Sequence, residues 1–173
     1  MEHETIEIKY QTDGGHGCMT LNAENFFPCS SKDLNFLLKK VIALCYWDEQ
    51  EKVISQIEDH CTRGIAETEE YKKLMPKFYQ ETKEHIPELE GKVTQYERMV
   101  ERIQEDKKKR KRSKEERPCS SPEESKGKEE LKAAKSHLQN TEAKCKEYVR
   151  KFEEASKKIE RYKQNLEILK QRK

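Results

Sequence analysis

The densest chemical feature of the sequence is a run of positively charged side chains near its middle. We call it the basic run; it comprises Lys107, Lys108, Lys109, Arg110, Lys111, Arg112 and, after one serine, Lys114. Cations at this density can neutralise several phosphates and release counterions, which gives salt-dependent affinity for DNA or RNA with little sequence preference. A solvated helix end is the alternative, because Lys and Arg in a last turn also favour the helix dipole. We expect the basic run to bind nucleic acid, a nucleoprotein complex or an acidic protein surface.

Zinc-ligand and nucleophile residue types are present but are not spaced as a site. The candidates in the first third of the chain are His16, Cys18, Cys29, Cys45, His60 and Cys61. They contain no C-x-x-C or H-x(3–5)-H pair, which is the spacing that makes a zinc site recognisable. Nothing resembles a nucleophile elbow or a phosphate-binding glycine loop. We therefore expect no catalytic residue, no metal ligand and no cofactor, and we interpret the six cysteines as reduced thiols.

The single tryptophan, Trp47, lies where the pattern predicts a break between two helices. A tryptophan at such a break serves either as a core anchor or as an exposed contact for a partner, so Trp47 is our candidate protein contact. Other aromatic residues, such as Tyr96 and Phe152, recur at helical spacing. That spacing favours packing in a helix seam over stacking on bases.

Long helices must position these side chains. Between residues 131 and 169, one stripe of mostly apolar residues recurs three and four apart: Leu131, Ala134, Leu138, Thr141, Cys145, Tyr148, Phe152, Ala155, Ile159, Tyr162, Leu166 and Leu169. The segment holds no proline or glycine, and charged residues fill the other positions, so it reads as a heptad helix with a narrow seam. At about 1.5 Å per residue it is close to 60 Å long and needs a partner to bury its seam.

Residues 61–103 provide that partner, because they carry the same spacing over the same length. Pro76 and Pro87 interrupt this arm and are expected to kink or segment it. A Pro- and Ser-containing connection, residues 106–128, would join the two arms into an antiparallel intramolecular pair. In the predicted register Val100 faces Ala134, although a slip of one heptad fits nearly as well. A parallel homodimer through the second arm is the competing arrangement.

The N-terminal residues predict a small head. Residues 5–10 alternate apolar and polar as a half-buried strand does, residues 12–17 contain the turn, and residues 18–26 give a weaker second strand. Ser30 or Ser31 then caps a helix that runs through Cys45. Residues 1–60 carry eleven acidic against five basic side chains, although the whole chain has a net charge of only +2.

The sequence therefore predicts an α+β, mostly α protein in which a small β-hairpin and helix head precedes a long antiparallel coiled-coil helical hairpin. The expected domains are a ββα-type acidic head at 1–60, a first, kinked arm at 61–105, a basic flexible linker at 106–128 and a second arm at 129–173. No stretch approaches about 18 consecutive apolar residues and no signal peptide is recognisable, so we expect no membrane contact. The expected location is cytoplasmic, or nuclear in a eukaryote. The oligomeric state stays open.

The predicted hairpin, the stretch Leu21-Asn22-Ala23-Glu24-Asn25-Phe26-Phe27-Pro28-Cys29 and the serine-capped helix resemble small accessory proteins of Gram-positive bacterial mobile elements. Some of these proteins are anti-CRISPR inhibitors. The resemblance covers the first third of the chain and assigns no functional residue. It implies a non-enzymatic protein that occludes a nucleic-acid-targeting complex, with the basic run on phosphates and the head or stalk on a protein. The alternative is a purely structural coiled-coil adaptor that joins protein partners and binds no nucleic acid.

Overall fold

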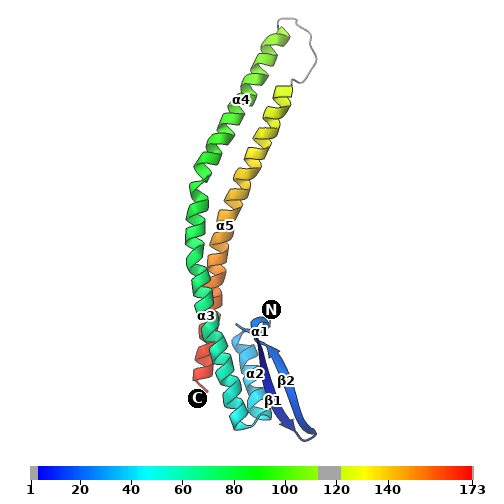
Figure 1. The fold of residues 1–173 in the computed structure, drawn as a ribbon, viewed down its shortest axis with the longest axis vertical. Helices are drawn as coiled ribbons and strands as arrows, with labels where there is room; N and C mark the ends of the chain where they lie inside the picture. The colour runs from blue at the N-terminus through cyan, green and yellow to red at the C-terminus, as the bar shows by residue number, and fades with distance from the viewer. Residues whose placement is uncertain (1–3, 113–121, 173) are drawn as a thin grey trace. The chain divides into compact units, whose positions relative to one another are not determined.

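The computed structural model of the chain describes residues 4–112 and 122–172 (Figure 1). These residues form two strands followed by five helices, and the predicted α+β, mostly α fold with an N-terminal β-hairpin and a helical hairpin is confirmed. They divide into two compact units, Met1–Leu74 with Lys151–Lys173 and Met75–Arg150. We call these unit 1 and unit 2.

Unit 1 begins with the predicted hairpin. β1 (Thr5–Thr12) pairs antiparallel with β2 (Gly15–Asn22), and Ile8 lies opposite Met19. The turn ends at Gly15, whose φ of 129° is a conformation that other residues rarely adopt. Ile6 and Ile8 are buried, as the alternating pattern requires.

The prediction of strand for residues 23–26 is wrong, because they form the short helix α1 (Ala23–Phe26). The side chain of Asn22 caps it by accepting a hydrogen bond from the backbone N–H of Asn25 at 3.1 Å. A helix cap at the end of β2 therefore outweighs the weak alternation that suggested a longer strand.

Ser30, one of the two predicted caps, is the N-cap of the helix α2 (Ser31–Leu44). The Ser30 hydroxyl accepts from the backbone N–H of Asp33 at 3.1 Å, and Asp33 lies in the positively polarised first turn. The buried face of α2 consists of Leu34, Leu37, Leu38 and Val41. This face packs on β1, so the core predicted between hairpin and helix is present.

Two longer helices complete the core of unit 1. α3 (Trp47–Glu84) contributes Val53, Ile57 and Cys61, and the C-terminal part of α5 (Pro122–Lys170) contributes Tyr162 and Leu169. The head therefore depends on residues that lie about a hundred positions later in the sequence.

The two predicted proline interruptions differ in outcome. At Pro76 the chain is not segmented, because α3 continues to Glu84, and the kink expected there stays a prediction. The predicted segmentation near Ile86 is confirmed, because a turn at His85 separates α3 from α4 (Ile86–Arg112), and Pro87 lies in the first turn of α4. A proline is tolerated there because the first backbone N–H groups of a helix have no partner within it.

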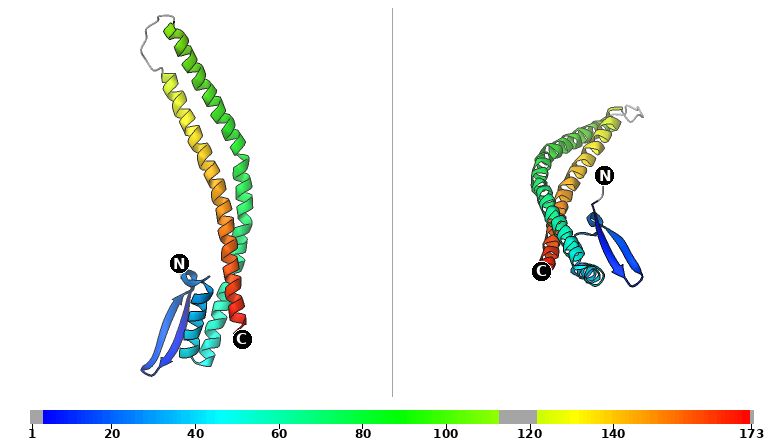
Figure 2. Two further views of the ribbon diagram at one scale, coloured as in Figure 1. Left: turned by 180° about the vertical axis from the view of Figure 1, so that it is seen from behind. Right: turned by 60° about the horizontal axis from the view of Figure 1, so that its bottom comes forward.

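In unit 2, α4 and α5 lie side by side and antiparallel (Figure 2). Lys107 pairs with Glu124 and, further along, Lys135 Nζ lies 2.7 Å from Glu97 Oε1. The ring of Phe78, from the end of α3, lies 5.9 Å from the ring of Tyr148. The seam residues Leu89, Val93, Val100 and Cys145 are buried, as predicted.

The predicted register is wrong by one heptad. Val100 was expected to face Ala134, but it lies against Gly127, whose ideal Cβ position is 3.5 Å from Val100 Cγ2. Unit 1 shows a shift in the same direction: the predicted register places Leu169 opposite Ile65, but Tyr162 lies against the neighbouring Gly64. The physical reason is a close fit in unit 1, where a Cβ on Gly64 would lie only 2.5 Å from Tyr162 Cζ. Glycine therefore leaves room for the ring.

The described part of the expected flexible linker is helical. α4 continues to Arg112 and α5 begins at Pro122. Lysine and arginine are good helix formers that suit a last turn, and Pro122 followed by Glu123 and Glu124 suits a first turn. Residues 113–121 lie outside the described residues.

Candidate protein-docking site

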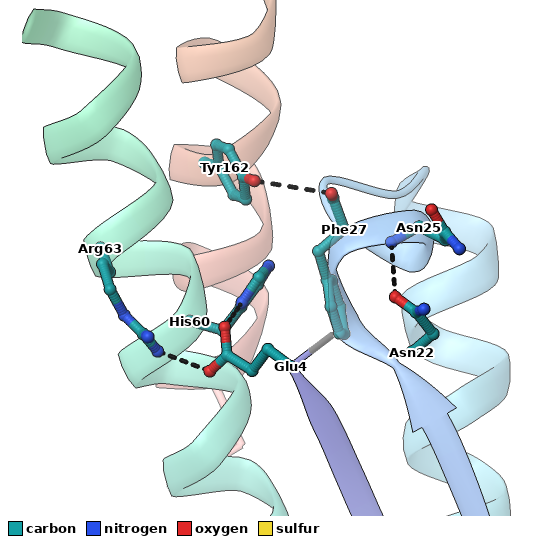
Figure 3. Close-up of polar contacts among 7 residues, drawn as sticks. All are labelled: Glu4, Asn22, Asn25, Phe27, His60, Arg63 and Tyr162. Carbon is teal, nitrogen blue, oxygen red and sulfur yellow. Dashed lines mark hydrogen bonds and ion pairs between the residues drawn. The ribbon is translucent and has the colours of Figure 1, made fainter. Parts of the chain in front are cut away.

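A polar cluster links the start of β1 to α3 within unit 1 (Figure 3). The Glu4 carboxylate lies 2.7 Å from His60 Nδ1 through Oε2 and accepts from Arg63 at 2.5 Å through Oε1. Burial alone would raise the pKa of Glu4, but the hydrogen bonds from His60 and Arg63 outweigh it and hold the pKa below its usual value of 4.5. The cluster therefore favours an ionised Glu4 and fixes the strand to the helix.

Next to this cluster, aromatic and amide side chains join α5 to the loop before α2. The rings of Phe27, His60 and Tyr162 follow one another at 5.7 and 6.3 Å. Asn165, which is fully buried, accepts from the Cys29 backbone N–H at 3.1 Å and donates to the Cys29 carbonyl at 2.9 Å. Sequence reasoning did not identify Glu4, Arg63 or Asn165. All these contacts join segments of unit 1 that lie far apart in the sequence.

The corner between α2 and α3 is exposed, in contrast to the buried contacts of Asn165 and Tyr162. The Gln50 side chain donates to the carbonyls of Cys45 at 2.8 Å and Ile42 at 3.3 Å, which satisfies the end of α2 and fixes the turn. Tyr46 and Trp47, on this turn, keep 64% and 70% of their surface exposed. The predicted candidate Trp47 is therefore on the surface and is not a core anchor.

A groove of about 900 Å³ adjoins Tyr46 and Trp47. We call it the corner groove; it is lined by Lys9, Tyr10, His16, Gly17, Cys18, Tyr46, Trp47, Asp48 and Glu49. The backbone N–H of Lys9 donates to Glu49 Oε1 at 3.3 Å, so the hairpin and α3 are connected at its base. Exposed aromatic rings beside carboxylates can take an apolar side chain and a cation together.

The basic run lies at the end of α4 in unit 2. Lys107 forms an ion pair with Glu124, whose other oxygen lies 2.8 Å from Lys128 Nζ. Hydrogen bonds from Lys107 and Lys128 lower the pKa of Glu124 to about 2. Lys108, Lys109, Arg110, Lys111 and Arg112 are exposed. Lys114 lies outside the described residues. Lys107 therefore joins the two helices, whereas the five residues after it face solvent.

The candidate zinc ligands are not brought together. Within residues 4–112 and 122–172, no three His, Cys, Asp or Glu side chains are grouped so that they could hold a metal ion. Burial, followed by the nearby Asp33 carboxylate, raises the pKa of Cys29 to about 11. Burial, with a smaller effect from Cys29, raises the pKa of Cys61 to about 12. Both thiols therefore stay protonated at neutral pH.

No helix in the described parts of the chain is both long and apolar enough to cross a membrane. No curated protein and no solved structure matches the chain. One family model does match: it describes the C-terminal region of transforming acidic coiled-coil-containing protein (TACC) and covers residues 47–173, which hold all of α3, α4 and α5.

This match corrects the resemblance to accessory proteins of Gram-positive mobile elements and to anti-CRISPR inhibitors, because the TACC family is eukaryotic. That resemblance was carried by residues 21–29 and their neighbours, which lie outside the match. Short capped turns of this kind occur in unrelated folds and are weak markers of ancestry. The match spans well over half of the sequence, and the chain therefore belongs to the TACC family through its coiled-coil region.

Proposed function

We propose that this chain is a non-enzymatic coiled-coil adaptor that joins protein partners. Membership of a coiled-coil family supports this function over nucleic-acid binding. The observation that carries it is the exposure of Trp47, because a large aromatic side chain that is 70% exposed beside a groove is typical of a contact for a partner. The coiled-coil helices hold this contact surface on a defined scaffold. We expect the adaptor to act in the cytoplasm.

The proposed occupant of the corner groove is a basic segment of a protein partner. Asp48 and Glu49 lie beside the two exposed rings, and residues 1–60 are acidic overall. A Lys or Arg side chain of the partner can stack on Trp47 while the carboxylates face its charge. Partners with an acidic contact segment should bind weakly because like charges would meet.

The only tryptophan of the chain gives a direct probe of this groove. A synthetic Lys- and Arg-containing amphipathic peptide, titrated into the full chain, should shift the Trp47 emission and protect it from iodide quenching. A peptide in which Glu replaces every Lys and Arg is the matched control and should do neither. The same response to both peptides, or no response to either peptide, would contradict the proposed chemistry of the groove.

A second candidate function rests on the basic run. Four of its side chains, Lys108, Lys109, Lys111 and Arg112, are exposed and close in sequence, which favours contact with an anionic surface such as nucleic acid. In a eukaryotic cell the same run has the composition of a nuclear-localisation signal. The sequence Ser121-Pro122 after the run is a candidate phosphorylation site, and Ser121 lies outside the described residues.

Replacing these four residues by Ala tests the second candidate. If they bind phosphates, the affinity for a short DNA or RNA duplex should fall, and the dependence of binding on salt should lose about one unit of slope per lost contact. Lys132→Ala, an exposed lysine elsewhere on α5, is the control. If binding is unchanged in this variant, or if the natural chain binds no nucleic acid at physiological salt, the second candidate function is contradicted.

A further inference from the structure

β2 has a backbone edge that no strand covers in the described chain. The sheet holds β1 and β2 alone, and the backbone N–H of Lys9 points away from β2 toward Glu49. Lys9 lies opposite Cys18, so these two residues form a pair without mutual hydrogen bonds. The N–H and C=O of Cys18 therefore point away from β1. Because strand geometry repeats every two residues, those of His16 and Thr20 point the same way.

This edge lacks the features that usually prevent strands from joining. Natural edge strands are protected by charged side chains, prolines, bulges or short length. β2 has eight residues, none of them charged or proline, in a chain of which 40% is charged. All eight pair in an unbroken register with β1, so there is no bulge. An edge of this kind is suited to take another strand.

Apolar side chains continue to the same edge. Met19 lies opposite Ile8, so both point to the face of the sheet that packs on α2. Ile8 is 2% exposed, whereas Met19 is 39% exposed. Figure 2 shows β2 on the side of the hairpin away from α2. An added strand would extend the core face and cover Met19.

We propose that β2 pairs antiparallel with β2 of a second copy of this chain, which gives a four-stranded sheet across a two-fold axis. The uncharged edge meets an identical uncharged edge, so no charge is opposed and none is left without a partner. A two-fold axis perpendicular to the sheet keeps Met19 of both copies on the core face. Pairing also strengthens a two-stranded hairpin, which is marginal by itself.

Hydrogen exchange on the natural full chain tests the pairing directly. The amides of His16, Cys18 and Thr20 should exchange at least about tenfold more slowly in concentrated than in dilute protein, because the new hydrogen bonds form only in the dimer. The amides of Met19 and Leu21, which bond to β1, should change much less. Fast exchange at the three outward amides at every concentration would overturn the proposal.

A proline variant gives an independent test by light scattering during size exclusion. Cys18→Pro removes an outward N–H without removing a bond to β1, and Cys18→Ser keeps that N–H as the matched control. The natural chain and Cys18→Ser should show twice the single-chain mass of 20.6 kDa, and Cys18→Pro should show that mass once. A dimer that survives in Cys18→Pro, or a natural chain that is monomeric throughout, would contradict β2 pairing.

Discussion

Units 1 and 2 both contain antiparallel helices, but they bury their side chains differently. Unit 1 has side chains with no exposed surface, namely Leu34, Leu38, Val53 and Ile57. The hairpin, three helices and α5 surround them. Among the described residues of unit 2, the buried apolar side chains keep at least 4% of their surface exposed, and the polar Thr141 and Glu124 are also buried. A seam between two helices cannot enclose a side chain as a core of several layers does.

The two units differ in what stabilises them, and the proposed recognition surface lies in unit 1. Burial holds unit 1 together, so its exposed corner at Trp47 is free to serve recognition. Unit 2 relies on a narrow seam and on exposed ion pairs such as that of Lys135 with Glu97. Because exposed ion pairs contribute little to stability, we expect unit 2 to respond weakly to most substitutions.

The largest expected difference comes from one chemical change made in both units. Leu38→Ala, in the core of unit 1, should lower the free energy of unfolding by about 4 to 5 kcal/mol. Leu89→Ala, in the seam of unit 2, should cost about 2 to 3 kcal/mol, because nearby side chains and water can reach the space. Urea unfolding of the two variants measures both values. Equal losses would show that the two units are packed alike.

Replacing one glycine in each unit by Ala should change stability in opposite directions. Gly64→Ala in unit 1 should destabilise by about 1 to 2 kcal/mol, because its Cβ would lie 2.5 Å from the Tyr162 ring. Gly91→Ala in unit 2 meets nothing within 4 Å and should stabilise by up to about 1 kcal/mol through helix propensity. Thermal unfolding gives both signs. Stabilisation by both substitutions would contradict the close fit that sets the register.

A smaller effect concerns Glu124 and pH. Because its pKa is lowered to about 2 in the folded chain, its contribution to stability is present above its ordinary value of 4.5 and is lost as pH falls toward 2. Lys107→Ala should raise the pKa of Glu124 toward 4.5 in an NMR titration. Lys108→Ala, one residue away and exposed, should leave it unchanged. The same shift in both variants would refute a specific Lys107 contact.

The smallest effect on stability is expected at Trp47. Since most of its side chain is already in water, Trp47→Ala should change the free energy of unfolding by less than about 0.5 kcal/mol. Chemical denaturation followed by circular dichroism checks this value. A loss of several kcal/mol would mean that Trp47 belongs to the core of unit 1 and not to a recognition surface.

Local patterns predicted much of the fold from the sequence. The alternation in β1, the cap at Ser30 and most of the predicted seam are present, because each depends on neighbours within a few positions. The predicted seam residue Phe152 is an exception, because its side chain is exposed. The heptad register was not predictable in the same way. A seven-residue repeat fits again after a slip of seven, and the apolar pattern alone does not choose. The fit of Tyr162 against Gly64 was the available signal, since a large ring needs a small residue opposite.

The candidate site was harder to predict than the fold. Trp47 was identified because a large aromatic residue at a helix break is visible in sequence. The contacts that build its surroundings, such as Glu4 with His60 and Asn165 with Cys29, join residues that are 56 and 136 positions apart. No local spacing marks such pairs. The division of the basic run into one paired lysine and several exposed residues likewise depends on Glu124, which comes from another helix.

The most direct test of the adaptor function is a pull-down with the full chain from eukaryotic cell extract, with and without nuclease. We predict that the captured proteins survive nuclease treatment and the replacement of Lys108, Lys109, Lys111 and Arg112 by Ala, but are lost from Trp47→Ala. Tyr71→Ala, an exposed aromatic residue outside the corner groove, should retain them. Release of the captured proteins by nuclease, or their retention by Trp47→Ala, would contradict a protein adaptor that acts through this groove.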